Sequence, residues 1–455
     1  MQVVSLHSRT RVRWVPALLS ISGTMVQLKP FRGLRPPASI AAKLSAPPYD
    51  VISSEEARVL AHTAGETSFL RVNRPEVDLP ADANQYDVQV YEVGSRNLRK
   101  FIENGWLEQD QSPSFYIYSQ RMGEHLQTGV VAGVAVEEYA MGVIKRRKTQ
   151  VKKENDRTRL THTQNANVGP VFLTYRPDQE IDELVTEITR CRAPEVQFVA
   201  PDGVEHCIWP VKDPIAVFAV RKAFDSVQAA YIADGHHRSA SAFRREENPA
   251  VGEMKIKEAV ARGDKVTGEE PFNYFLAVLF PANQLLCMEY NRVVRDLAGL
   301  SEREFLDRIA VKFDVREILD GERAEPARIH EMGMCLKGRW FRLQAKNDIF
   351  PDGDPVKSLD VQILYDNILS PMLNIGNPRA DDRICYVGGI RGSEEVQRRV
   401  THGVDPWTVG FCMYPVSMDQ VMKVADQDML MPPKATWFEP KLRSGLVVRL
   451  LDDPR

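Results

Sequence analysis

A short segment near the middle of the chain carries the residues best suited to chemistry. Its sequence, Ala233-Asp234-Gly235-His236-His237-Arg238, places a carboxylate, a glycine, two imidazoles and a guanidinium one after another. Residues 229–233 predict a buried strand and the small residues after Arg238 predict a helix, so the chain is expected to turn at Gly235. A helix N-terminus offers free N–H groups to an anion, and an arginine can hold two of its oxygens. The segment therefore predicts a phosphate-binding turn.

A purely structural interpretation competes with this one. Asp-Gly is common turn chemistry, Asp234 could cap the helix, and one histidine could fill a gap in the core. However, burying two imidazoles and a guanidinium costs free energy unless each group is paired. This cost favours the functional interpretation.

The second candidate is Lys153-Glu154-Asn155-Asp156-Arg157, within the charge-dense residues 145–159. Glu154 or Asp156 could act as a general base or as a Mg²⁺ ligand, while Lys153 and Arg157 neutralise phosphate charge. The alternative is a solvated loop or an exposed helix face.

The third candidate is residues 431–441, where prolines fix an irregular loop. Lys434 and Lys441 of this loop could reach an anionic ligand. The loop chemistry alone favours a proline-stiffened surface loop over a binding site.

Composition narrows the class of protein. The chain has 455 residues, 59 of them basic and 62 acidic, giving a formal net charge of −3, so coating a nucleic acid or an anionic membrane is disfavoured. A basic run at 145–153 could still follow a phosphate backbone. No apolar stretch approaches the roughly 20 residues of a membrane span. Six cysteines without a CxxC pair argue against a zinc module or disulfide scaffold and predict a cytoplasmic protein.

The elements that must position these residues predict an α+β protein. Helices are expected at 53–62, where Ser53 and Glu56 form a capping box, and at about 84–104, with strands between and after them. A strand pair is expected at 272–280 and 285–290.

We expect residues 1–24 to be an extension or a start placed too early, 25–298 to form an α+β region and 299–455 an α/β region packed on it. The sequence predicts no oligomeric state.

Six ordered segments together resemble an uncharacterised prokaryotic family, domain of unknown function 1015. They are Phe31–Pro36, Pro47–Ile52, Leu70–Glu76, Lys153–Arg157, Ala233–Arg238 and Met431–Leu446. Family members usually carry His-Glu where this chain has Arg146-Arg147. If the family's glutamate is the catalytic base or a metal ligand, this chain lacks that group and would be impaired or would use Glu154 instead.

The turn in this family looks like the phosphate-binding turn of the ParB/sulfiredoxin-like superfamily, which includes partition proteins, sulfiredoxins and free-serine kinases. The resemblance implies a mixed-sheet core of that type, elaborated by extra helices. It also implies that Asp234, Gly235, His236, His237 and Arg238 hold the phosphates of ATP, ADP or CTP, with Mg²⁺ as partner ion.

Two functions follow from the residues and the resemblance. The first is a small-molecule kinase that uses a Mg-nucleotide, with an amino acid such as L-serine as acceptor and with Asp234 or Glu154 orienting or deprotonating the acceptor hydroxyl. The alternative is a ParB-like regulatory protein that binds a nucleotide without catalysis or hydrolyses it slowly. A sulfiredoxin-like reductase is disfavoured because no cysteine lies beside the turn.

Overall fold

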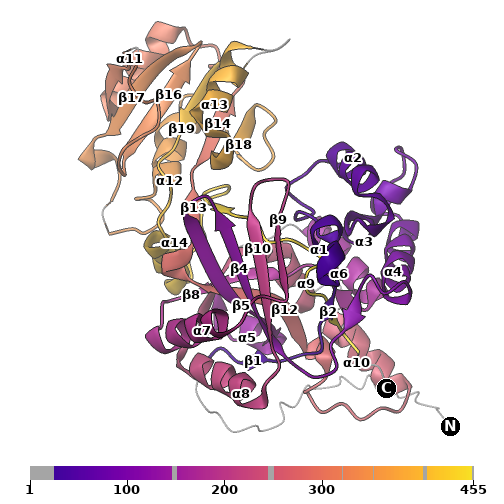
Figure 1. The fold of residues 1–455 in the computed structure, drawn as a ribbon. Coiled ribbons are helices and arrows are strands. Elements are labelled where there is room, and N and C mark those ends of the chain that lie inside the picture. Colours follow the sequence, from indigo (N-terminus) through magenta and orange to yellow (C-terminus); the bar gives the residue numbers. More distant parts are fainter. Residues whose placement is uncertain are drawn as a thin grey trace, which may run out of the picture.

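The computed structural model describes residues 25–145, 151–243, 251–319, 321–351, 353–402 and 407–452. The predicted extension 1–24 and the Arg146-Arg147 pair lie outside them. Two β-sheets organise the described residues (Figure 1).

A nine-stranded mixed sheet forms the larger layer. In sheet order its strands are β6 (Ile144–Lys145), β11 (Ala230–Asp234), β8 (Val171–Tyr175), β12 (Tyr274–Pro281), β5 (His125–Ala135), β4 (Phe115–Met122), β10 (Glu205–Val211) and β9 (Val196–Val199), and β1 (Leu28–Lys29) pairs with β5. β11 runs parallel to β6 and β12 runs parallel to β8, whereas the other pairs are antiparallel. The predicted α+β class with a mixed sheet is confirmed.

A six-stranded antiparallel sheet follows along the chain. Its strands, in order, are β15 (Phe313–Glu317), β17 (Arg339–Ala345), β16 (Glu331–Leu336), β19 (Val409–Cys412), β14 (Tyr290–Val294) and β18 (Ile384–Gly388). Figure 1 shows this orange layer at the upper left, apart from the larger sheet. The division predicted at residue 298 stays a prediction.

Helices cover both sheets. They are α1 (Ala38–Leu44), α2 (Ser54–Ala64), α3 (Leu70–Asn73), α4 (Val88–Glu103), α5 (Val136–Ala140), α6 (Val151–Gln164), α7 (Gln179–Cys191), α8 (Pro214–Ala223), α9 (His236–Phe243), α10 (Val251–Ala261), α11 (Glu302–Lys312), α12 (Asp360–Leu364), α13 (Gly392–Thr401) and α14 (Met418–Asp426). The capping box of Ser53 and Glu56 is present at the start of α2. The helix predicted from residue 84 begins later, at Val88, because the Asp87 side chain caps it by accepting from the N–H of Gln89.

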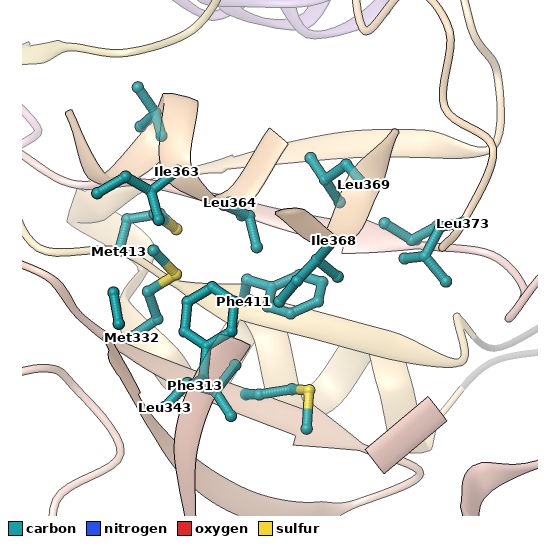
Figure 2. Packing of buried hydrophobic residues seen from close by; sticks show 14 of the residues in the cluster. Phe313, Met332, Leu343, Ile363, Leu364, Ile368, Leu369, Leu373, Phe411 and Met413 are labelled. Carbon is teal, nitrogen blue, oxygen red and sulfur yellow. The ribbon is translucent and has the colours of Figure 1, made fainter. Parts of the chain in front are cut away.

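Apolar side chains pack on both faces of the larger sheet. Successive side chains of β4 point to opposite faces of the sheet, so Phe115 and Ile117 belong to one cluster and Tyr116 and Tyr118 to the other. The smaller sheet has its own core, in which Phe313 and Phe411 meet the residues of α12 and the turns after it (Figure 2).

The C-terminal segment returns to the larger sheet after the smaller one is complete. β20 (Trp437–Glu439) pairs with β13 (Leu286–Met288), and β21 (Arg449–Leu450) pairs with β7 (Ala166–Asn167). β2 (Leu34–Arg35) pairs with β3 (Glu108–Gln109), and Leu34 of β2 also forms a bridge with Val448 of the C-terminal segment. This return brings the loop of the third sequence candidate to the first sheet.

Candidate functional site

The turn at 234–238 joins β11 to α9 as the sequence predicts. Gly235 has φ +87, in the left-handed region, and a Cβ there would lie 3.0 Å from Nε of Arg238 and 3.2 Å from Cα of Val171. Glycine is therefore required both by the backbone conformation and by the close approach of these groups. The carbonyl of Gly235 accepts from the N–H of Arg238 at 2.9 Å and of Ser239 at 3.1 Å, which starts the helix.

Asp234 ends the strand and is held by a lysine from the far end of the sequence. Lys441 Nζ lies 3.3 Å from Asp234 Oδ2, and Oδ1 accepts from the N–H of Gly235 at 2.7 Å. Burial alone would raise the pKa of the Asp234 carboxyl, but the charges of Lys441, Arg238 and His236 bring it well below its usual range. Asp234 therefore stays ionised near neutral pH and is a weak proton acceptor.

The guanidinium of Arg238 lies beneath the turn, against the ring of Tyr49. Its central carbon is 5.8 Å from the ring centre, and its Nε is buried without a hydrogen-bond partner. Among the described residues no carboxylate lies within ion-pair distance of Arg238, although the charge of Asp234 attracts it. Since a buried charged donor is costly when unmatched, this group is suited to an anion.

The charged segment of the second candidate lies on α6, which packs against α9. Arg157 donates from Nε and Nη2 to Oδ2 of Asp156, at 2.8 and 2.6 Å, and lies 4.1 Å over the ring of Tyr49. Tyr91 donates to the other carboxylate oxygen of Asp156 at 3.0 Å. Both oxygens of Asp156 thus accept hydrogen bonds within the protein, and these bonds fix the orientation of the carboxylate.

The charges of Glu154 and Lys153 act on His237, the second imidazole of the turn. Glu154 is buried on α6, whereas Lys153 is exposed. Burial and the charge of Lys153 lower the pKa of His237, opposed by the charges of Asp50 and Glu154. His237 is therefore neutral near pH 7, and its buried Nδ1 has no hydrogen-bond partner within the residues that the structure describes. A neutral imidazole in this position can accept a proton.

Sequence reasoning missed the contribution of Tyr49 and Asp50. They belong to a segment predicted only as an extended entry to a helix, and Arg74 holds it in place. Arg74 donates to the carbonyls of Tyr49 and Ile52, at 3.0 and 2.8 Å. The signal was present, because both segments are among the six that carry the family resemblance.

The two lysines of the third candidate are separated in the structure. Lys441 reaches Asp234. Burial alone would lower the pKa of Lys441, but the negative charges of Asp234 and Glu439 raise it above its usual value. Lys434, with φ +54, instead places Nζ 5.1 Å from the ring of Tyr290 in the smaller sheet. Of the two lysines, the structure thus brings only Lys441 to the turn, and an anion-binding role for Lys434 stays a prediction.

Within the described ranges, no group of three or more His, Cys, Asp or Glu side chains is arranged to hold a metal ion. Magnesium in nucleotide sites commonly uses one or two carboxylates and takes its other ligands from phosphates and water. Glu154 stays the predicted ligand. Over the same residues, no helix is long and apolar enough to cross a membrane.

Comparison with known proteins identifies the family. Residues 28–362 match the family described as "Protein of unknown function (DUF1015)". The match covers more than half of the chain, so the chain belongs to this family. No curated protein shows a significant sequence match.

Solved structures with related folds share little sequence with the chain. A free serine kinase in complex with AMP is 12% identical, over 68% of this chain and 86% of its own, with a TM-score of 0.30. SbnI with a C-terminal truncation, from Staphylococcus aureus, is 10% identical over 70% and 87%, with a TM-score of 0.36. A conserved hypothetical protein from Pyrococcus furiosus is 12% identical over 71% and 95%, with a TM-score of 0.32. At these TM-scores the similarities assign no activity to this chain.

Proposed function

We propose that the chain is a nucleotide-dependent phosphotransfer enzyme acting on a small molecule, with residues 234–238 holding the nucleotide phosphates. The observation that carries the proposal is Arg238, a guanidinium with a buried, unmatched Nε beside a glycine turn and a helix N-terminus. Phosphate oxygens satisfy both the guanidinium and the first N–H groups of a helix. A purely structural turn gains nothing from leaving this donor unmatched.

The residues divide into those that hold charge and those that can move a proton. Asp234, ionised and paired with Lys441, orders the turn and the C-terminal loop. His237, neutral and beside Asp50 and Glu154, is the base that we assign to the acceptor hydroxyl. Phosphoryl transfer depends mainly on positioning and electrostatics, so it needs no covalent nucleophile in this site.

The nucleotide is ATP, ADP or CTP, and magnesium would neutralise the charge of its phosphates. Glu154, buried on α6, is the carboxylate that we assign to the ion, and Asp156, which accepts from Tyr91 and Arg157, is the alternative. A single carboxylate with phosphate oxygens and water is an ordinary magnesium environment.

The test is a turnover assay with the purified chain, Mg²⁺, each of the three nucleotides, and a panel of hydroxyl-bearing acceptors. L-serine comes first, by analogy with the free-serine kinases that the turn resembles. Phosphorylated acceptor, detected by mass spectrometry, is the expected product. His237→Gln should lower turnover by about a hundredfold or more while nucleotide affinity is retained.

The matched control is His62→Gln, which changes an exposed histidine on α2 and should leave turnover as it is. Nucleotide binding without phosphorylation of any acceptor would contradict the enzyme and favour the nucleotide-binding regulator. Equal turnover in the two histidine variants would remove His237 from the mechanism.

A further inference from the structure

A small cavity lies behind the turn, where four segments of the chain meet. Its volume is about 30 Å³, and its lining includes Asn73 from α3, Arg157 and Thr161 from α6, Arg238 from α9, and Ser444 of the C-terminal loop. Pockets that enclose whole drug-sized ligands are about ten times larger or more. The cavity therefore has room for one terminal group of a ligand and not for a nucleotide.

The wall of this cavity contains an amide that the protein leaves unmatched. Asn73 is 3% exposed, and within the residues that the structure describes neither its Nδ2 nor its Oδ1 has a hydrogen-bond partner. Its backbone carbonyl, by contrast, accepts from Nη1 of Arg157 at 3.4 Å. Buried side-chain amides are almost always bonded, so an unmatched donor and an unmatched acceptor at one position indicate a ligand that supplies both.

Charge around the cavity specifies the ligand further. Arg157 is compensated by the carboxylate of Asp156, and Asp234 is compensated by Lys441. Arg238 is the cavity guanidinium for which the described residues supply no carboxylate within ion-pair distance, and its Nε is buried without a partner. A carboxylate carries only acceptors, which matches the donors of Arg238 and the Nδ2 of Asn73.

We propose that this cavity binds the carboxylate of the small acceptor, and that the acceptor is an amino acid or a hydroxy acid. The carboxylate accepts from Asn73 Nδ2 and from Nη1 of Arg238, which lies beside Gly169 of the cavity wall, while the adjacent ammonium or hydroxyl group donates to Asn73 Oδ1. Nε and Nη2 of Arg238 lie beside Gly235 and are left to the nucleotide phosphates. This inference rests on the proposed function and adds to it the subsite that holds the acceptor. It gives Asn73 a binding role that is separate from the turn and from the nucleotide phosphates.

Binding to the wild-type chain without nucleotide is the first test. Calorimetry compares L-serine and glycolate with serinol and ethylene glycol, in which a CH2OH group replaces the carboxylate, and with orthophosphate. The two carboxylates should bind at least about tenfold more tightly than the compounds that lack the carboxylate, as expected for the loss of a charge-assisted bond. Equal binding of ethylene glycol and glycolate, or binding of orthophosphate alone, would overturn the assignment, and so would the absence of carboxylate binding.

Asn73→Asp is the matching change in the protein. The new carboxylate has nearly the size of the amide, can pair with Arg238, and repels the ligand carboxylate, so carboxylate affinity should fall by about tenfold or more. Asn347→Asp adds the same charge at an exposed position and should leave the affinity as it is. Circular dichroism and melting of the variant confirm that it folds, and the wild-type comparison of ligands stands independently of it.

The two proposals fail in different ways. Carboxylate binding that Asn73→Asp abolishes, without phosphorylation of any acceptor, leaves the cavity assignment standing and removes the enzyme. Phosphorylation of serinol as fast as L-serine leaves the enzyme standing and removes the cavity assignment.

Discussion

Two arginines, one at each sheet, show how differently the two regions treat a guanidinium. At the smaller sheet Arg292 is 3% exposed, and its Nη1 and Nη2 donate to the backbone carbonyls of Tyr290 and Lys434. At the larger sheet Arg238 has a buried Nε with no partner and lies beside a cavity. The first guanidinium donates to backbone carbonyls, although burial lowers its pKa to about 10, whereas the second has a buried Nε to which the described residues offer no acceptor.

Two aspartates repeat the contrast. Burial raises the pKa of Asp360, although His330 close by opposes the shift, whereas Lys441 and its neighbours lower the pKa of Asp234 despite burial. The larger sheet thus keeps its aspartate ionised at a turn, and the smaller one tolerates a carboxyl whose charge is costly. The difference agrees with the site that we propose at the larger sheet.

The largest expected effect is at the smaller sheet. Phe411 is fully buried in the core of the smaller sheet (Figure 2), so Phe411→Ala should lower the free energy of unfolding by about 3–5 kcal/mol. Nucleotide affinity of the folded variant should stay within about threefold, because no phosphate-binding residue lies there. Denaturant unfolding and calorimetry measure the two quantities.

Phe218→Ala is the control, because this phenylalanine of α8 is 68% exposed and its loss should change unfolding by less than about 0.5 kcal/mol. A loss of nucleotide affinity in folded Phe411→Ala would break the comparison, since the smaller sheet would then contribute to the site.

The second prediction sets the two arginines against each other. Arg238→Ala should weaken nucleotide binding by about 1.5–3 kcal/mol, the range of a hydrogen bond to a charged group, and leave the free energy of unfolding within about 0.5 kcal/mol. Arg292→Ala should do the reverse, because the buried carbonyl of Tyr290 and the partly buried carbonyl of Lys434 lose their donors, at a cost of about 2–3 kcal/mol in unfolding. Thermal melting and nucleotide titration of both variants distinguish these outcomes. If Arg238→Ala unfolds the chain, the turn is a packing feature and the comparison fails.

Local sequence chemistry was enough to predict the turn, and long-range topology explains what was missed. Gly235 needs its left-handed backbone and α9 follows directly, so residues 230–243 could be inferred from neighbours along the chain. The strands expected at 272–280 and 285–290 do not pair with each other. β12 lies between β5 and β8, and β13 pairs with β20, about 150 residues later.

The partners of the turn were hidden for the same reason. Lys441 lies 207 residues from Asp234 in sequence, yet the two side chains are in contact. Lys434 lies only 7 residues before Lys441, but its ammonium group lies over the ring of Tyr290 instead. Asn73 likewise reaches the cavity only because α3, α6 and the C-terminal loop converge on it. Spacing along a chain does not specify such convergence.

The smallest expected effects separate the two aspartates by the sign of their pH dependence. An ionised Asp234 stabilises the fold above the ordinary aspartate pKa of 3.8, and this stabilisation is lost as pH falls toward its lowered folded-state value. Asp234→Asn should therefore cost about 1 kcal/mol at pH 7 and flatten the loss of stability in acid.

Asp360 behaves in the opposite way, because ionising a carboxyl with a raised folded-state pKa removes stability as pH rises through that value. Asp360→Asn can still accept from the His330 N–H and should be neutral or stabilising by less than about 1 kcal/mol at pH 7. Denaturant unfolding between about pH 2 and pH 8 measures both, and two variants that respond with the same sign would mean that the sheets do not differ in how they hold charge.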